Sequence, residues 1–276
     1  MISCPEVQRN VIRRHYDVST LFYRLLWGPH IHHGLWHADE SIAQAQLQLT
    51  DTLASLAKIQ SNKVLDVGCG MGGSSIHLVR NYNCHVTGIT LSRVQRNWAA
   101  LSARLQRASK RTRFLQQDAE QFEAEEQSLD VIWSIECTEH LFDKAAFFAK
   151  AAKWLRPGGR IAICAWLAGA TQDDQVRTQQ VIDVCEGFFC PSLGTMDDYR
   201  HWFEAAGLKV TEQHDWTSKV MQTWEICRQR VARSGVRRLA PWIDADAAMF
   251  LDRFDTILNA YQSGAMQYGC FVAEKP

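Results

Sequence analysis

A long hydrophobic run is missing from the sequence. No stretch of about 18 apolar residues occurs within its 276 residues, so no membrane-spanning helix is expected. The opening, MISCPEVQRNVIRRHY, also lacks the apolar core of a signal peptide, and we expect a cytoplasmic protein. An excess of one charge is missing too, because 30 Lys and Arg balance 30 Asp and Glu. A nucleic acid is therefore not the expected main partner.

Closely spaced cysteine pairs are also missing. The nine cysteines are scattered, none forms a CxxC motif, and several lie inside apolar runs. This distribution argues against a disulfide scaffold or a zinc site, and we interpret the cysteines as buried, reduced thiols. With 46% apolar and 22% charged residues, the composition is that of a globular protein with a substantial core.

Strand-like and helix-like segments alternate in the middle of the chain. This alternation is typical of βαβ units that build a parallel sheet. We expect strands at 63–68, 85–92, 112–118, 129–135 and 160–166, with helices at 74–82, 93–108 and 144–155 between them. The last two strands, 208–216 and 266–276, are expected to form an antiparallel edge hairpin interrupted by a long excursion.

The segments outside this core are helical and rich in aromatic residues. We expect one domain, 1–276, with an N-terminal lid (1–60), a core (61–166), and substrate-side helices with closing strands (167–276). Several aromatic residues of the last part suit a flat or lipophilic ligand: Trp202, Phe203, Trp216, Trp224, Trp242, Phe250 and Phe254. The segment 228–238 contains five arginines, which favour either a solvated helix face or peripheral contact with an anionic membrane.

A glycine-rich loop follows the first core strand. Gly68, Gly70, Gly72 and Gly73 lie in LDVGCGMGGSS, between a predicted strand and a predicted helix. Glycine permits a tight turn and a close approach to a ligand, and the helix start offers free N–H groups. The spacing differs from the dinucleotide GxGxxG and P-loop motifs, so we predict a nucleoside-type ligand without a pyrophosphate. The alternative is a turn that only packs the helix on the sheet.

Three titratable residues crowd the end of the fourth core strand. Glu136, Glu139 and His140 occur in SIECTEHL, directly after an apolar run. Burying such groups costs desolvation energy, and open α/β sheets bind ligands at the carboxyl ends of their strands. The cluster is therefore a candidate catalytic site. The alternative is a helix start at which the glutamates favour the N-terminus and the histidine packs on the sheet.

The glycine loop resembles motif I of class I S-adenosylmethionine (SAM) methyltransferases, and the following segments keep the order of that class. Nearly the whole chain resembles the tocopherol methyltransferase branch and, more distantly, plant alkaloid N-methyltransferases and cyclopropane synthases. The resemblance implies an α/β fold with a seven-stranded Rossmann-like sheet and a reversed last hairpin. It also implies an N-terminal helical lid, helical insertions after strand five and between strands six and seven, and SAM as the cofactor.

The resemblance further implies a set of cofactor contacts. GITLSRVQ carries the variant TLSxxQ, so Thr90, Leu91 and Gln95 would contact the ribose where most of the class uses an acid. QQDAEQF resembles the adenine-binding turn, in which Asp118 would accept from the adenine amino group and the Ala119 amide would face the ring. A helix N-cap is the alternative role of this aspartate. The expected cofactor-binding set is His33, Gly68, Gly70, Gly72, Thr90, Leu91, Gln95, Asp118, Ala119 and Ile135.

The segment 15–36 resembles the N-terminal arm of tocopherol methyltransferases, including its HHG. This places Tyr16 over the methyl group. Cyclopropane synthases bind SAM here with a Tyr and a Ser, whereas this sequence has His33 and Gly34, so the contact has different chemistry. Four histidines invite a metal hypothesis, but no HxxxH helix or cysteine partner accompanies them, and we expect no metal. They are His30, His32, His33 and His37.

SIECTEHL resembles the catalytic segments of the tocopherol and alkaloid enzymes. Methyl transfer from a sulfonium is an in-line displacement that requires alignment, exclusion of water and removal of one proton. The resemblance implies His140 as the base, oriented by Glu136 and Glu139, with Tyr16 beside the methyl group. Trp166 stands where cyclopropane synthases have a bicarbonate-binding histidine, so alkene methylenation is disfavoured.

The expected function is methyl transfer to a small lipophilic or aromatic acceptor, such as a tocopherol-like quinol. An N-methyltransferase of a small amine or alkaloid is the nearest alternative, and a SAM-binding protein without turnover is the alternative from another class. C-, N- and O-methylation are not separated by these motifs, and nothing in the sequence indicates an oligomeric state.

Overall fold

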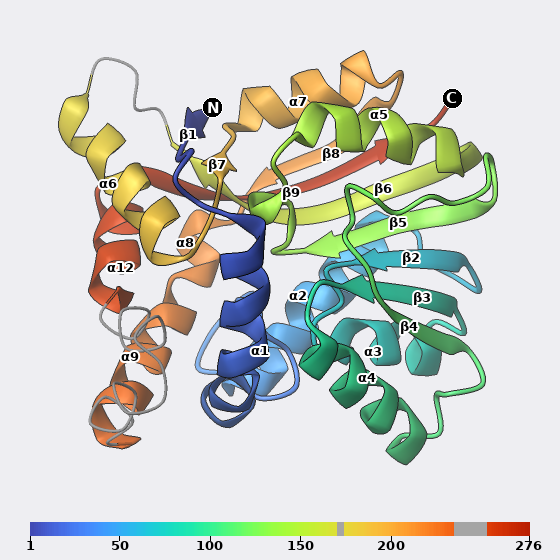
Figure 1. Cartoon of the computed structure of the whole chain (residues 1–276), viewed down its shortest axis with the longest axis horizontal. Helices are drawn as coiled ribbons and strands as arrows, with labels where there is room; N and C mark the ends of the chain where they lie inside the picture. The colour runs from blue at the N-terminus through green and yellow to red at the C-terminus, as the bar shows by residue number, and fades with distance from the viewer. Residues whose placement is uncertain (170–173, 235–252) are drawn as a thin grey trace.

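The structure, a computed structural model, describes residues 1–169, 174–234 and 253–276 (Figure 1). A seven-stranded sheet in the order β4-β3-β2-β5-β6-β9-β8 forms its centre. The strands are β2 (Lys63–Val67), β3 (His85–Thr90), β4 (Thr112–Gln116), β5 (Leu129–Ile135), β6 (Leu155–Ala168), β8 (Lys209–Asp215) and β9 (Met266–Glu274). The first five are parallel, whereas β9 runs antiparallel to both β6 and β8. The expected Rossmann-like sheet with a reversed last hairpin is confirmed.

Helices cover both faces of this sheet, which explains why its central strands are apolar at nearly every position. On one face lie α2 (Ile42–Leu56), α3 (Gly73–Asn81) and α4 (Arg93–Leu105), and on the other lie α5 (Lys144–Trp154) and α7 (Met196–Ala205) (Figure 1). In β5, Val131 and Trp133 belong to the core beneath the first group of helices, and Ile132 belongs to the core beneath the second. Neither face of this strand is left to solvent.

The junction between α5 and β6 differs from the prediction. The helix predicted over 144–155 and the strand predicted over 160–166 leave the RPGG segment, 156–159, as a break between them. The helix does end at Trp154, but β6 begins at the next residue, Leu155. The glycines do not break the strand because Gly158 N donates to Lys275 O and Lys275 N donates to Gly159 O. These bonds continue the pairing of β6 with the C-terminal strand.

The remaining elements gather where β5 ends (Figure 1). Helix α1 (Arg9–Leu26) crosses this end of the sheet, and beside it lie α6 (Gln175–Gly187), α8 (Thr217–Val220), α9 (Gln222–Ser234) and α12 (Phe254–Gln262). A short antiparallel pair, β1 (Ile2–Ser3) with β7 (Ser192–Leu193), joins the N-terminus to this region and was not predicted. In the described part of the chain, no helix combines the length and apolar character needed to cross a bilayer.

Candidate active site

Two glycines shape the loop between β2 and α3. Gly68 has a φ of +76°, and a Cβ atom there would lie 2.3 Å from Cys137 Cβ. Glycine therefore lets the loop pack directly against the segment that follows β5. Gly70 has a φ of +50°, and the nearest protein atoms would lie 4.0 Å from its Cβ position. The space beside this second glycine is open, as a close approach by a ligand requires.

Gly72 has a different place from the one expected. Its Cβ position lies 2.9 Å from Ala99 Cβ and 3.0 Å from Phe114 Cζ, on the side of α4 and β4. The residue begins α3 in a left-handed conformation, with φ +80°, and lines none of the cavities around the loop. Close packing of the loop on its neighbours accounts for this glycine, so the expected cofactor contact is not supported.

The open side of the loop borders a cavity that we call the loop cavity. Of the expected cofactor-binding residues, six line it: Gly68, Gly70, Thr90, Leu91, Gln95 and Ile135. Thr90 Oγ1 donates to Gln95 Oε1 across 2.9 Å, which holds these two polar side chains together at the cavity wall. Ser92 caps α4 by accepting from Gln95 N at 3.0 Å. The strand-end and capping roles of this turn therefore coexist with a ligand-facing one.

Asp118 and Ala119 lie outside the loop cavity. Asp118 borders a neighbouring surface hollow that shares Leu91 with the loop cavity. Its Oδ2 lies 2.9 Å from Arg9 Nη1, and its Oδ1 accepts from Glu120 N at 2.9 Å. The carboxylate thus stabilises a local turn, and no helix begins here, so the helix N-cap considered as its alternative role is not formed. The Ala119 side chain is buried in the core beneath α5.

A second cavity, which we call the aromatic cavity, lies beside the first. Its walls include five aromatic side chains, which come from α1 and its C-cap, from β6 and from the residue after α6: Tyr16, Tyr23, Trp27, Trp166 and Phe188. Ile31, Glu139 and Cys190 complete much of the remaining lining. Three residues with polar side chains line both cavities: Tyr16, Glu136 and His140. Ligands bound in the two cavities would therefore meet at these residues.

Tyr16 and His140 form a hydrogen-bonded pair at this junction. Tyr16 Oη lies 2.8 Å from His140 Nε2, and His140 Nδ1 lies 3.0 Å from the carbonyl oxygen of Phe189. A carbonyl oxygen only accepts, so Nδ1 carries the proton and the neutral ring accepts at Nε2 from the tyrosine hydroxyl. Burial lowers the pKa of His140 to about 4. The imidazole is therefore neutral at pH 7, and the adjacent tyrosine hydroxyl is its hydrogen-bond donor.

Glu136 is enclosed by hydrogen-bond donors. Its Oε1 accepts from His33 N (2.8 Å), His33 Nδ1 (2.9 Å) and Tyr268 Oη (2.7 Å), and its Oε2 accepts from Trp166 Nε1 (3.0 Å). Burial alone would raise the pKa of this carboxyl, but the His33 contacts outweigh it and hold the pKa below its usual value. Glu136 is therefore an ionised, immobilised carboxylate. The structure shows no hydrogen bond from it to His140, so it does not orient that imidazole in the expected way.

Glu139 is in the opposite protonation state. It is buried, and burial raises the pKa of its carboxyl to about 8. Its Oε1 accepts from the Trp166 backbone N–H, while Oε2 has no hydrogen-bond partner. At pH 7 this residue is a neutral carboxylic acid at the wall of the aromatic cavity, with hydrogen-bonding capacity to spare. It too makes no hydrogen bond to His140.

The backbone explains how the two glutamates come to face the same region. Glu136 has a φ of +53°, and a single 3₁₀ turn, η1 (Thr138–His140), follows it. The α-helix that would have put Glu136 and His140 on one face is not formed. The orienting groups for the histidine are Tyr16, from α1, and a backbone carbonyl of the segment after α6. No side-chain pattern in the sequence could have identified that carbonyl.

The histidines of the N-terminal arm bind one another and Glu136. His33 is buried behind Glu136 and lines neither cavity, so direct contact between this imidazole and the cofactor is not supported. His30 Nδ1 lies 3.2 Å from His32 Nε2, and His32 Nδ1 lies 2.7 Å from His33 O. Within the described residues, no group of three or more His, Cys, Asp or Glu side chains is arranged to hold a metal ion.

Of the predicted aromatic residues that the structure describes, one pair lies beside the aromatic cavity and three residues lie elsewhere. Trp224 and Phe254 pack against Trp27, behind the wall of the aromatic cavity. Trp202 and Phe203 instead pack around Phe148 on α5, on the other face of the sheet, and are ordinary core. Trp216 stacks on His214. Trp242, Phe250 and part of the arginine segment 228–238 lie outside the described residues.

The fold and the paired cavities define the class of SAM-dependent methyltransferases. The chain matches the family described as mycolic acid cyclopropane synthetase over residues 5–267, and it belongs to that family. SAM is its cofactor. The loop cavity fits this group, because Gly70 leaves space for close approach and Thr90, Gln95 and Glu136 offer polar atoms in a lining that is otherwise largely apolar. When bound, SAM supplies an electrophilic methyl group on a sulfonium.

Similar proteins come from plants and bacteria. The chain is 28% identical to "Tocopherol O-methyltransferase, chloroplastic" of Arabidopsis thaliana over 98% of this chain and 83% of that protein. It is 31% identical to "27-O-demethylrifamycin SV methyltransferase" of Amycolatopsis mediterranei (strain S699) over 97% of both. The cyclopropane synthase MmaA2 of Mycobacterium tuberculosis shares the fold, with a TM-score of 0.87 and 20% identity over 99% of this chain and 100% of that one.

Proposed function

We propose that this methyltransferase acts on a small, lipophilic acceptor that carries a phenol or hydroquinone ring, bound in the aromatic cavity. The observation that carries the proposal is that the loop cavity and the aromatic cavity share Tyr16, Glu136 and His140. A donor methyl in the first cavity and an acceptor in the second would face each other at the hydrogen-bonded tyrosine–histidine pair. The names of two similar proteins support the same acceptor class: the Arabidopsis tocopherol O-methyltransferase and "2-methyl-6-phytyl-1,4-hydroquinone methyltransferase" of Synechocystis sp., which is 30% identical over 72% of this chain and 65% of that protein.

The aromatic cavity has the composition expected for a neutral aromatic ring. Its walls are mainly aromatic, and no Lys or Arg side chain is among the described residues that line it. An anionic acceptor would therefore have no cation to compensate its desolvation. The protonated Glu139 carboxyl, with its free Oε2, can donate a hydrogen bond to an oxygen of the ring. This donor would fix the orientation of a phenol whose faces contact the aromatic walls.

Proton removal follows from the tyrosine–histidine pair. A neutral acceptor that gains a methyl from a sulfonium becomes a strong acid, so even a weakly basic group can take its proton as the new bond forms. His140 Nε2 accepts from the Tyr16 hydroxyl, which allows the acceptor proton to reach the imidazole directly or through that hydroxyl. The Phe189 carbonyl keeps the proton on Nδ1 and then hydrogen-bonds the imidazolium. Removal of His140 is expected to reduce turnover by roughly 10²–10⁴-fold.

Glu136 has an electrostatic role in this proposal. Its four donors hold the charge in place, and it lines both cavities, next to the site that we propose for the sulfonium. A fixed carboxylate attracts the cationic cofactor and interacts weakly with the neutral product of methyl loss. The electron-rich faces of the neighbouring aromatic rings would act in the same direction. This carboxylate is accordingly a binding group and not the base.

The test is incubation of the full chain with methyl-labelled SAM and a panel of phenols, hydroquinones and amines, with products identified by mass. The proposal predicts labelled methyl on a phenol or hydroquinone, and labelling of amines alone would contradict it. His140→Ala and Tyr16→Phe are expected to lower turnover while binding of SAM, followed by calorimetry, is retained. Tyr82→Phe is a matched control, because Tyr82 Oη donates to Asp51 and the residue lines neither cavity.

We also propose a cytoplasmic location, which is supported by the nine cysteines, all of them free. Eight of these thiols are buried, and reduced thiols match the reducing interior of a cell. Nucleic acid is not proposed as a partner.

A further inference from the structure

Exposed apolar side chains concentrate on two neighbouring helices. Among the described residues, eight large hydrophobic side chains are strongly exposed, and five of them lie on α1 and α4. They are Leu21 and Leu25 on α1, and Val94, Leu101 and Leu105 on α4. Leu25 and Leu105 are 71% and 77% exposed, so their placement is not a consequence of partial packing. Apolar residues that gather at one place on a surface commonly mark an interaction site.

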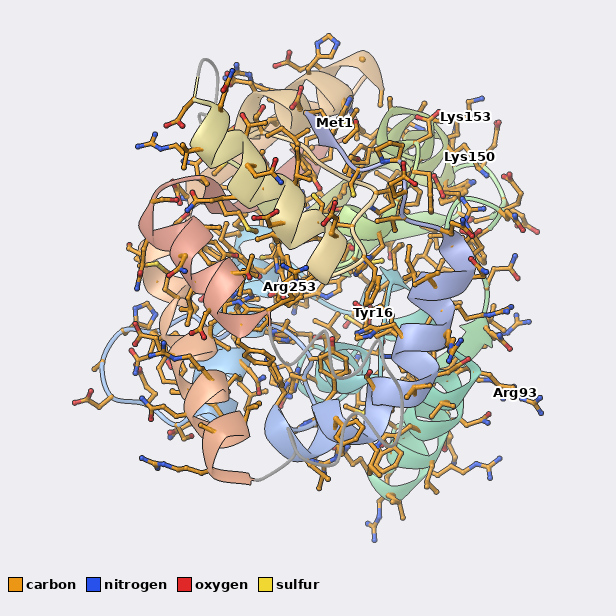
Figure 2. The ribbon with its side chains drawn as sticks, turned by 60° about the vertical axis from the view of Figure 1, so that its left-hand side comes forward. Met1, Tyr16, Arg93, Lys150, Lys153 and Arg253 are labelled. Carbon is orange, nitrogen blue, oxygen red and sulfur yellow. The ribbon has the colours of Figure 1, made fainter. Side chains whose placement is uncertain are left out.

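These residues share one face of the molecule. The exposed residues of α4 recur at 93, 94, 97, 101, 104 and 105, which is the spacing of a single helix face. Helix α1 lies beside α4 in both views (Figures 1 and 2). Asp17 on α1 accepts from Ser92 Oγ at 2.6 Å and from Val94 N at 3.3 Å, which fixes the start of α4 against α1. We define the α1/α4 face as Leu21, Arg24, Leu25, Val94, Leu101, Arg104, Leu105 and Arg107.

The same face carries three arginines and no acidic residue in a chain of zero net charge. The sequence around α4 adds to this charge, because 67–117 contains eight Lys or Arg residues and no acidic residue. Arg24, Arg104 and Arg107 are exposed, and the structure shows no ion pair for them with any described residue. The positive charge of this region is therefore presented outward and is balanced by acids elsewhere in the molecule.

We propose that the α1/α4 face docks on the surface of an anionic lipid bilayer. Arginines would interact with the lipid head groups while the exposed leucines enter the boundary of the acyl region. A nucleic acid would account for the arginines but not for the exposed leucines. A second copy of the chain would bring two like-charged faces together. An anionic bilayer alone is complementary to both the charge and the apolar side chains of this face.

Docking at this face would bring the two cavities close to the lipid. The inner side of α1 supplies Ile12 and Tyr16 to the loop cavity and Tyr23 to the aromatic cavity. Figure 2 shows Tyr16 at the inner side of α1 and Arg93 projecting outward from α4 beside it. One helix thus has a cavity-lining side and a lipid-facing side. An acceptor dissolved in the bilayer would have a short path to the site.

The test measures sedimentation of the full chain with vesicles, without SAM and without an acceptor, so that its result is independent of methyl transfer. The vesicles are made either of phosphatidylcholine alone or of phosphatidylcholine with phosphatidylglycerol. Each cation near an anionic surface contributes about fivefold in affinity. The triple variant R24Q/R104Q/R107Q should therefore bind anionic vesicles about 100-fold more weakly. L101S/L105S should lose at least tenfold through the apolar contacts.

A matched control carries changes of the same kind elsewhere. K153Q/V176S alters an exposed cation on α5 and an exposed apolar residue on α6, and should bind vesicles like the unchanged chain. Thermal unfolding checks that every variant folds, and turnover of a detergent-dissolved acceptor should be unaffected by the face variants. Equal binding to neutral and anionic vesicles, or unchanged binding by both face variants, overturns the proposal. So does a dimer, seen in sedimentation velocity, that L101S/L105S dissociates while vesicles are not bound.

Discussion

Substitution of Glu136 by Gln tests how the junction between the two cavities is held together. The change keeps the shape of the side chain and removes its charge. Glu136 is surrounded by four donors, and Gln must place an NH₂ group where one carboxylate oxygen was. If Oε1 is kept as an oxygen to serve its three donors, the amide NH₂ faces Trp166 Nε1–H. Two donors then confront each other in a buried site.

The magnitude follows from these four contacts. Hydrogen bonds to a charged group are stronger than neutral ones by about 1 kcal/mol. The three bonds to Oε1 lose this advantage when the carboxylate becomes a neutral amide. A buried donor without a partner costs about 1–3 kcal/mol more. Relief from burying a charge offsets part of this sum. We expect the free energy of unfolding to fall by about 3 kcal/mol, a large part of the 5–15 kcal/mol that is usual for a folded protein.

The measurement is urea unfolding of both proteins at about pH 7 and about pH 4. The pKa of Glu136 lies below its usual value, so its stabilisation is present above the unfolded pKa and is lost as pH falls through the folded pKa. The difference between the two proteins should therefore shrink at the lower pH. Glu274→Gln is the control, since this half-exposed carboxylate pairs with Arg160 and should cost less than about 1 kcal/mol. A loss below 1 kcal/mol for Glu136→Gln would refute the reasoning.

Three further predictions concern the loop and the two other buried titratable groups. Gly68→Ala should abolish binding of S-adenosylhomocysteine in calorimetry, because the added Cβ would lie 2.3 Å from Cys137. Gly207→Ala is the control, since Gly207 has a φ of +77° and no atom within 4 Å of its Cβ position. This control should lower the free energy of unfolding by only about 1–2 kcal/mol, the cost of a left-handed residue, and should leave binding intact. Burial raises the pKa of Glu139 to about 8, so the stability of the protein should decline as pH rises from the unfolded pKa towards 8. Glu139→Gln should remove that decline in thermal unfolding. Parallel curves of stability against pH for the two proteins would contradict this prediction. Burial lowers the pKa of His140 to about 4, so turnover measured against pH should show no inflection between about 5.5 and 7, and a histidine-like step near 6.5 would count against the assigned neutral state.

The parts of the fold that were predictable are those with a strong local pattern. The strand 129–135 was placed correctly because it is apolar at most positions and buried on both faces. The start of β6 was misplaced because Pro and Gly signal a break locally, whereas their hydrogen bonds to Lys275 depend on a strand more than a hundred residues away. The pair β1 and β7 comprises two residues on each side, too few for any periodicity.

The candidate site divides in the same way. The sequence identified Tyr16, Glu136, Glu139 and His140, and the structure brings all four to the wall of one cavity. It could not identify their partners, because the Phe189 carbonyl is backbone and every residue has one. The protonation states of the two glutamates could not be predicted from the sequence either. Glu136 and Glu139 are three residues apart in one motif, and only their burial and donors separate an ionised carboxylate from a neutral acid.

The contact between His33 and Glu136 has a consequence for how ligands exchange. The arm around His33 gives the carboxylate two of its four donors, and Gly34 N is bonded to Thr223 Oγ1 at 2.9 Å. If this arm swung outward as a gate, an ionised group would stay behind with half of its hydrogen bonds broken, at a cost of several kcal/mol. Opening of this arm is therefore expected to be a costly route for ligand exchange, and we expect substrate and product to pass beside other elements of the site.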